Sequence, residues 1–329
     1  MDGFATAQTR VRDLKRHPAI RAAELGVING LWGFLLGGSR LGSLNLMFNA
    51  DDPASMIDGF NAVIRNQEAG LRVCHHIYSD EEIRQDPAKR EVTLHYFPAG
   101  AAGRGAERPF MLICPGGGYT MVASIWEGYP VAGRLSALGF PAFVLRYRSG
   151  KAARYPNPQD DLGRAVGYIL ERAAEFGVRK TGYGLMGFSA GGHLAATFGL
   201  AEAGFRKYGL PAPAALALAY PVVSMGEHTH QGSRQNLLGK ESDLALVEAL
   251  SVERQVDPAY PPTYLWHCEA DSTVPIINST ALAEALERAG VPCKLKRVPG
   301  GRHGLSLALG TDAEGWLEEA VEFWQAVCA

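Results

Sequence analysis

The most informative stretch of the chain is residues 181–196, TGYGLMGFSAGGHLAA. Residues 181–186 are predicted to form a strand, although a weakly apolar one, and a helix is predicted from about Ala190. Between them, GFSAG at 187–191 fits the Gly-x-Ser-x-Gly pattern of a strained strand-to-helix turn, which needs small residues and presents its serine hydroxyl above the sheet edge. The helix N-terminus adds partial positive charge where an anion would form. Ser189 is therefore the candidate nucleophile, unless it merely caps the helix.

From about residue 90, short apolar runs alternate with amphipathic helical patterns. The run 91–97 alternates at period two, and four further runs are apolar throughout, as strands buried on both faces are: 110–114, 142–145, 215–219 and 263–267. Helices are predicted after a cap at Asn157, from Pro275 to Gly290, and across 316–327. Strands that alternate with helices of this length imply parallel βαβ units. The predicted fold class is doubly wound α/β, with a mostly parallel sheet and helices on both faces.

Residues 1–80 do not join this alternation, so we predict an N-terminal extension ahead of a catalytic domain at 81–329. Residues 52–66 could form a helix, whereas the Gly-rich apolar segment 25–48 has no single period. The extension is interpreted either as a packing or homodimer-contact segment or as a lid over the active site. Its main apolar run ends at Arg40 after fifteen uncharged residues, short of the ~20 that a membrane span needs. No secretory signal pattern is seen, and we expect a soluble, cytoplasmic protein.

The composition indicates a folded globular chain. The 329 residues carry 32 Lys and Arg against 34 Asp and Glu, and 47% of them are hydrophobic. Disorder needs low hydrophobicity and high net charge, and nucleic-acid binding leaves a basic excess, so both classes are excluded. The five cysteines are odd in number and widely spaced. They indicate small buried side chains in a reducing compartment rather than a disulfide framework or a zinc site.

A serine hydroxyl needs a base within hydrogen-bond reach, and that base needs a carboxylate to orient it. Folds with this type of turn place the three in the chain order Ser, acid, His. Asp271 follows the buried run 263–267 in a loop before a Pro-started helix, with Glu269 as a nearby competitor. His303 follows a predicted strand at 294–298, and its flanking glycines let a loop carry the imidazole over the serine. Asp271 and His303 are therefore the predicted acid and base.

The other histidines fit the role of base less well. His267 lies in a buried strand and is interpreted as a core residue, and His193 would point along the helix that Ser189 begins. The remaining candidates lie in a polar segment or ahead of the catalytic sheet: His228, His230, His75 and His76. Because His228-x-His230 has no Asp or Cys companion at ligand spacing, no metal and no cofactor are predicted.

Three consecutive glycines lie within PGGGY at 115–119, directly after a predicted central strand. Glycines expose backbone N–H groups without a Cβ in the way, so this loop could supply an oxyanion donor that complements the N–H of Ala190. We favour Gly117, with Gly116 or Gly118 as alternatives. A phosphate-binding loop is not supported, because no Gly-Lys-Ser/Thr follows, and the Rossmann glycine spacing is also missing.

Together these motifs resemble the α/β-hydrolase superfamily. More narrowly, they are similar to its bacterial acetyl-esterase and carbohydrate-esterase-like branch, which includes acetylxylan and feruloyl esterase-like proteins. The resemblance covers about residues 90–329. It rests on PGGGY at 115–119, Glu127-Gly128 with Pro130-Val-Ala132 beyond it, Tyr147-Arg148, Asp161, GFSAGGHLAA at 187–196, ADSTVP at 270–275 and His303-Gly304. Pro115 stands where the lipase and esterase pattern often has His, although this branch commonly has Pro there.

The resemblance implies a serine esterase that acts on short acyl esters, especially acetyl groups on carbohydrate hydroxyls. The expected partner is a small-molecule ester such as an acetylated oligosaccharide. Tyr119 and Trp126, in the loop after the glycines, either stack on a sugar ring or only pack at the rim. Two alternatives on the same fold are a prolyl-oligopeptidase-like serine peptidase and a non-catalytic binding protein.

Overall fold

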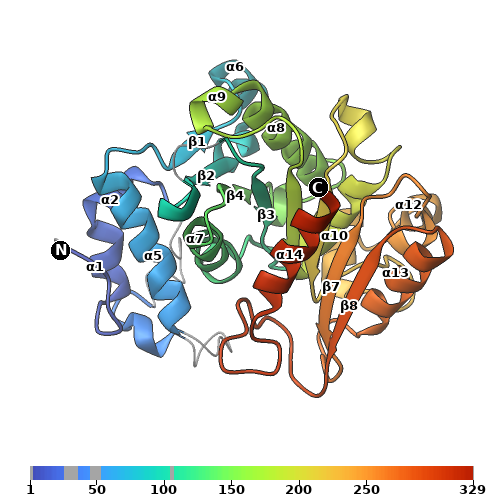
Figure 1. Cartoon of the computed structure of the whole chain (residues 1–329). Helices are drawn as coiled ribbons and strands as arrows, with labels where there is room; N and C mark the ends of the chain where they lie inside the picture. Colours follow the sequence, from blue (N-terminus) through green and yellow to red (C-terminus); the bar gives the residue numbers. More distant parts are fainter. Residues whose placement is uncertain (1–2, 26–35, 45–52, 104–106, 329) are drawn as a thin grey trace.

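One eight-stranded sheet lies at the centre of the computed structural model, which describes residues 3–25, 36–44, 53–103 and 107–328 (Figure 1). The strand order is β1-β2-β4-β3-β5-β6-β7-β8. β1 and β2 run antiparallel to their neighbours, and the other six strands pair in parallel. The strands are β1 (Cys74–His76), β2 (Thr93–Phe97), β3 (Met111–Cys114), β4 (Ala142–Arg146), β5 (Gly184–Phe188), β6 (Ala215–Ala219), β7 (Thr263–Cys268) and β8 (Cys293–Val298).

Helices cover both faces of the sheet. The main ones are α5 (Pro53–Glu68), α7 (Tyr129–Ala137), α8 (Asn157–Glu171), α10 (Ser189–Gly199), α13 (Ile277–Arg288) and α14 (Trp316–Cys328). Along β3, Met111 and Ile113 join the core under α7 and α14, whereas Leu112 and Cys114 join the core under α8, α10 and α13. Because successive strand side chains point to opposite faces, a strand covered on both sides must be apolar throughout. The predicted doubly wound α/β class is confirmed.

Some predicted boundaries differ from the observed ones. α8 begins at Asn157 itself, and the side-chain amide of this residue donates to the carbonyl of Ala152 instead of capping the helix. The helix predicted from Pro275 begins two residues later, at Ile277. β2 begins at Thr93, two residues after the start of the alternating run. The described chain also contains short α-helices: α1 (Val11–Arg16), α2 (Pro18–Ala22), α6 (Asp80–Gln85), α9 (Ala173–Phe176), α11 (Gln231–Leu238) and α12 (Leu244–Ala249).

The N-terminal helices pack onto the β1 side of the sheet, where α5 lies beside α7, α2 packs on α5 and α1 contacts α2 (Figure 1). α5 and α7 approach closely, because a Cβ at Gly59 would lie 2.8 Å from the backbone nitrogen of Pro130. The placement of His75 and His76 ahead of the sheet is wrong, since both belong to its edge strand β1. The predicted domain division at residue 80 stays a prediction, although β1 shows that the sheet begins before it.

The Gly-rich segment 25–48 falls mostly on residues 26–35 and 45–48, which lie outside the described part of the chain. Its interpretation as a dimer contact or a lid therefore stays a prediction. Among the helices that the structure describes, none combines the length and the apolar character needed to cross a bilayer.

Candidate active site

Ser189 lies at the junction of β5 and α10 with a φ of +51°. This backbone region is uncommon for a residue with a side chain and marks local strain. The flanking glycines are required by space: a Cβ at Gly187 would lie 2.5 Å from the carbonyl oxygen of Gly191, and one at Gly191 would lie 2.1 Å from that of Cys114. The small residues of the motif thus allow the sharp turn that lifts the serine above the carboxyl end of the sheet.

The three residues predicted as nucleophile, base and acid meet at this end of the sheet. The Ser189 Oγ and His303 Nε2 atoms are 2.8 Å apart, and His303 Nδ1 is 2.6 Å from Asp271 Oδ2. With a proton on Nδ1, the imidazole donates to the carboxylate and its Nε2 accepts from the serine hydroxyl. Ser189 follows β5, Asp271 follows β7 and His303 follows β8, so parallel strands bring them together.

Asp271 is held by an extended set of donors. Its Oδ1 accepts the backbone N–H groups of Thr273 and Val274, both at 2.9 Å, and its Oδ2 lies 3.2 Å from His267 Nε2. Burial by itself raises the pKa of Asp271, but the hydrogen bonds from His267 and His303 and the backbone donor outweigh it and hold the pKa well below its usual range. The carboxylate is therefore ionised at neutral pH.

His267 is a buried strand residue, as predicted, and its ring also contacts Ser279 Oγ at 2.8 Å and the Val274 carbonyl at 2.9 Å. The sequence indicates only that His267 is buried, so its additional contact with Asp271 was not predicted. Glu269, the competing acid, forms a salt bridge with Arg297 on the surface, with 2.8 Å between Oε1 and the guanidinium.

The glycine loop lies against Ser189. The Gly116 N–H donates to Glu127 Oε2 at 2.7 Å, so it is already occupied, whereas the N–H groups of Gly117 and Ala190 have no hydrogen-bond acceptor in the part of the chain that the structure describes. Gly117 has a φ of +116°, and a Cβ there would lie 2.3 Å from the Met121 carbonyl oxygen. This geometry favours Gly117 over Gly116 as the partner of Ala190 in an oxyanion hole.

A cavity of about 270 Å³ opens beside Ser189 and His303. Side chains from distant parts of the chain line it, among them Ser55, Met56, Met121, Trp126, His230 and Leu305. Trp126 thus lies where a substrate contact was expected. His230, which was not favoured as the base, also lines the cavity. Its Nδ1 accepts the Ser233 N–H at 3.2 Å.

The expectation that Tyr119 stacks on substrate is wrong. The side chain of Tyr119 is fully buried, and its hydroxyl lies 2.9 Å from His193 Nδ1. His193 in turn bonds the carbonyl of Leu250 through Nε2 at 2.9 Å, which places both rings in the core. The φ of Tyr119 is left-handed, +58°, and no local pattern in the sequence indicates that its ring is buried.

Metal-ligand atoms gather at one place among the described residues. Glu24, Cys74 and His76 bring ligand atoms within 4.8 Å of one another at the edge strand β1, whereas His228 and His230 belong to no such group. Burial raises the pKa of the Cys74 thiol to about 12, which keeps it protonated, and the guanidinium of Arg146 lies close enough to oppose this shift. The trio is separate from Ser189 and its cavity.

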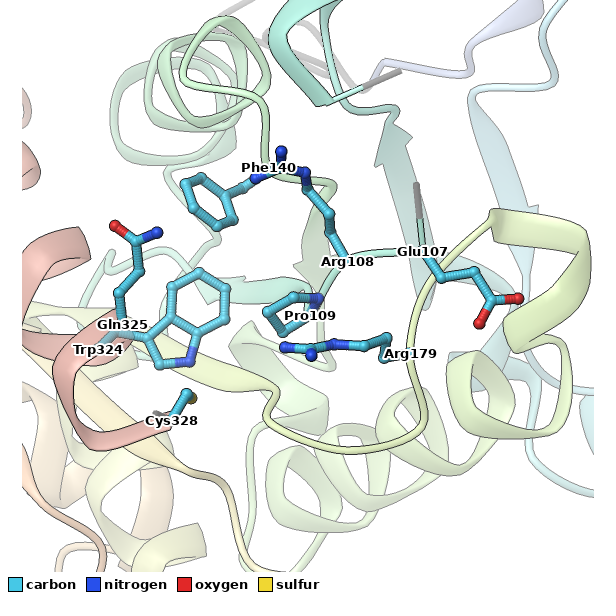
Figure 2. Close-up of a pocket in the computed structure, with 8 residues that line it drawn as sticks. All are labelled: Glu107, Arg108, Pro109, Phe140, Arg179, Trp324, Gln325 and Cys328. Atoms are coloured by element: carbon cyan, nitrogen blue, oxygen red, sulfur yellow. The ribbon is translucent and has the colours of Figure 1, made fainter. Parts of the chain in front are cut away.

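A second cavity, of about 320 Å³, lies at the other end of the sheet (Figure 2). Arg108 and Pro109 precede β3, Phe140 precedes β4, and the ring of Trp324 on α14 lies between them and Cys328. These residues stand at the amino ends of the parallel strands. Because Ser189 stands at the carboxyl ends, this cavity is not part of the candidate active site.

A family model described as BD-FAE matches residues 96–286. The chain belongs to the BD-FAE family. The matched region includes the glycine loop, Ser189 and Asp271. His303 and the N-terminal residues lie outside it.

Curated relatives of this BD-FAE chain include an endo-1,4-beta-xylanase B from Butyrivibrio fibrisolvens. It is 35% identical over 219 residues, which are 64% of this chain and 34% of the relative. The acetylxylan esterase of Xylanibacter ruminicola is 31% identical over 224 residues, 67% of this chain and 44% of the relative. The aligned region thus spans less than half the length of either relative.

Solved structures show the same fold. An acetyl ester-xyloside bifunctional hydrolase from Caldicellulosiruptor lactoaceticus is 34% identical, with a TM-score of 0.69, and the match covers 78% of this chain and 96% of the other. The carboxylesterase Cest-2923 from Lactobacillus plantarum is 29% identical, with a TM-score of 0.61 and coverage of 71% and 92%. This BD-FAE chain is therefore an α/β hydrolase.

Proposed function

We propose that this BD-FAE chain is a serine carboxylic-ester hydrolase that removes short acyl groups, above all acetyl, from carbohydrate hydroxyls or other small esters. The observation that carries the proposal is the continuous hydrogen-bond chain from Ser189 through His303 to Asp271 at the wall of a cavity. Such a chain is what a serine needs to become a nucleophile at neutral pH.

The proposed reaction has two halves. Ser189 Oγ attacks the ester carbonyl carbon while its proton passes to His303 Nε2, and Asp271 stabilises the imidazolium. The N–H groups of Gly117 and Ala190 stabilise the tetrahedral oxyanion. When this collapses, the ester C–O bond breaks and His303 returns the proton to the leaving alcohol. Water then attacks the acyl-enzyme, gives its proton to His303, and the acid leaves as Ser189 regains its proton.

The substrate class is supported by the names of the relatives and by the cavity. An acetylxylan esterase and an acetyl ester-xyloside hydrolase are among the similar proteins. A space of about 270 Å³ suits a small acyl group better than a long chain, and the Trp126 indole offers a face for a sugar ring.

We expect a panel of esters to show this preference directly. Acetylated xylo-oligosaccharides and p-nitrophenyl acetate should be hydrolysed with the highest kcat/KM, which should fall by more than about tenfold when the acyl chain is lengthened to octanoate. Aminoacyl-prolyl amides serve as the comparison for the peptidase alternative. Faster cleavage of these amides, or equal rates for acetyl and octanoyl esters, would contradict the proposal.

The N-terminal segment contributes to the same cavity. Ser55 and Met56, in the first turn of α5, line it together with Ser189 and His303. For this part of the segment, we propose that α5 covers one side of the cavity as a lid would, but as a fixed wall. This wall limits the size of the acyl group that binds. If α5 served only as a dimer contact, its side chains would not need to reach the cavity.

A substitution in α5 tests this role. Met56→Ala should enlarge the cavity and raise the rate ratio of butyrate to acetate esters by roughly tenfold, because a methylene in an apolar pocket carries about that discrimination. Ile57→Ala is the matched control, since Ile57 is buried on the same helix but does not line the cavity. Both variants lose stability through lost packing. An unchanged rate ratio in Met56→Ala would refute the role of α5.

A further inference from the structure

Glu127 is a buried carboxylate beside the nucleophile that the proposed reaction leaves unused. It lies in the π-helical turn η4 (Ser124–Gly128), is only 6% exposed and lines the cavity. Its Oε2 accepts the Gly116 N–H at 2.7 Å, and its Oε1 accepts the Tyr220 hydroxyl at 2.9 Å. Within the described residues it has no salt bridge with Lys or Arg. A buried carboxylate costs free energy unless hydrogen bonds or charges compensate it.

The first of these hydrogen bonds connects Glu127 to the oxyanion loop. A Cβ at Gly116 would lie 2.8 Å from Glu127 Oε2 and also 2.8 Å from Ser189 Cβ, so the carboxylate, the loop and the nucleophile are packed without free space. Gly116 immediately precedes Gly117, the favoured oxyanion donor. The next peptide group carries the Gly117 N–H, and its carbonyl oxygen accepts the Ala123 N–H at 3.0 Å. The hydrogen bond to Glu127 and this one together hold the loop on both sides of Gly116.

The second hydrogen bond connects Glu127 to the loop of the catalytic histidine. Tyr220, directly after β6, accepts the Ser306 N–H at 3.0 Å on the same hydroxyl that it donates to Glu127. Its ring stands edge-on to the His303 imidazole, with centroids 4.8 Å apart. Tyr220 and Ser306 both have positive φ, +36° and +53°, a strained conformation that the surrounding contacts must hold.

The two contacts of the Glu127 carboxyl group are both made by donors, the Gly116 N–H and the Tyr220 hydroxyl, so each oxygen has a partner. Burial raises the pKa of Glu127, and the interaction with His303 and the two hydrogen bonds only partly oppose that rise. Geometry therefore gives Glu127 its role, because one side chain bonds two separate loops.

We propose that Glu127 is a positioning residue, which holds the oxyanion loop and the His303 loop around Ser189 through Gly116 and Tyr220. The inference rests on the proposed esterase activity. Glu127 does not attack, donate a proton or contact the scissile bond in this scheme. It is thus distinct from Asp271, which bonds the other side of the imidazole.

Glu127→Gln tests the proposal because the substitution keeps the shape and replaces one of the two acceptor oxygens. The glutamine must turn its NH₂ group toward either the Gly116 N–H or the Tyr220 hydroxyl, so one of the two hydrogen bonds is lost or weakened. We expect kcat for p-nitrophenyl acetate to fall roughly 10- to 100-fold, as for a modest misplacement of catalytic groups, with KM changed less than about twofold. Tyr220→Phe should lower kcat in the same direction, and the double variant should lose less than the product of the two.

Asp161→Asn is the control for a buried carboxylate with a purely structural role. Asp161 lies in α8, bonds Arg148 and Tyr78, and does not line the cavity. This variant should lower Tm while kcat stays near the parental value. Parental kcat in Glu127→Gln would overturn the inference, as would a kcat loss matched by Asp161→Asn at equal loss of Tm. A parent that hydrolyses no ester would instead refute the proposed function.

Discussion

Ser189→Ala should lower kcat for ester hydrolysis by roughly 10⁶-fold, because the substitution removes the atom that attacks the carbonyl. The oxyanion donors and His303 stay in place, so weak residual catalysis by bound water is the most that can remain. Alanine tolerates the backbone of position 189 about as well as serine, and the side chain is small and only 7% exposed. Tm should therefore change little, and the loss can be assigned to chemistry.

Hydrolysis of p-nitrophenyl acetate and labelling by a fluorophosphonate probe together measure this loss. The parent should be labelled and Ser189→Ala should not be, because the probe reacts with an activated serine. Ser136→Ala is the matched control, since Ser136 lies in α7, bonds the Pro98 carbonyl and is remote from the cavity. A Ser189→Ala variant that keeps parental activity would refute the nucleophile. A parent that is not labelled would favour the non-catalytic binding protein.

Asp271→Asn should lower kcat by roughly 10⁴-fold at neutral pH. The backbone N–H groups of Thr273 and Val274 both donate to one oxygen of Asp271, so an asparagine must place its own oxygen there. Its NH₂ group then faces His303 Nδ1 and His267 Nε2, where a carboxylate oxygen stood. The imidazole of His303 is driven to carry its proton on Nε2, and it can no longer accept the serine proton.

The same substitution has a predictable effect on stability. The folded state holds the pKa of Asp271 below its usual value, so it favours the ionised form. That contribution is present above the unfolded pKa of about 4 and is lost as the pH falls below it toward the folded value. Asp271→Asn should therefore lower Tm at neutral pH, and the difference from the parent should shrink in strong acid.

Glu269→Gln is the control for the acid assignment. Glu269 lies two residues from Asp271 but pairs with Arg297 at the surface. Its loss should leave kcat near the parental value, because an exposed ion pair contributes little. If Glu269→Gln were inactive and Asp271→Asn active, the acid would have to be reassigned.

Several predictions were accurate because their causes are local. A strand buried on both faces must be apolar throughout, which located β3, β4, β6 and β7 to within two residues. At the glycines around Ser189, a Cβ would collide with the neighbouring backbone. The five-residue motif is therefore enough to predict the turn. The order of Ser189, Asp271 and His303 follows from the order in which strands are added to such a sheet.

Other features depended on residues far apart in the chain. β1 has three residues, two of them histidines, and is a strand only because it pairs with β2. Tyr119 follows a run of glycines, after which an exposed side chain is expected. It is buried instead, and its hydroxyl forms a hydrogen bond with His193, 74 positions away. Met56 reaches the cavity only because α5 packs on α7.

By itself, the amino-acid sequence determined the alternation of strands and helices, the strained turn at Ser189 and the loops that carry Asp271 and His303. Periodicity and steric space set these features within a few residues. Only the tertiary structure decided that Glu127 bonds both Gly116 and Tyr220, and that residues of the N-terminal helix α5 line the cavity. Such contacts arise when separate elements pack together, and the distances between them are not encoded in any short stretch of the chain.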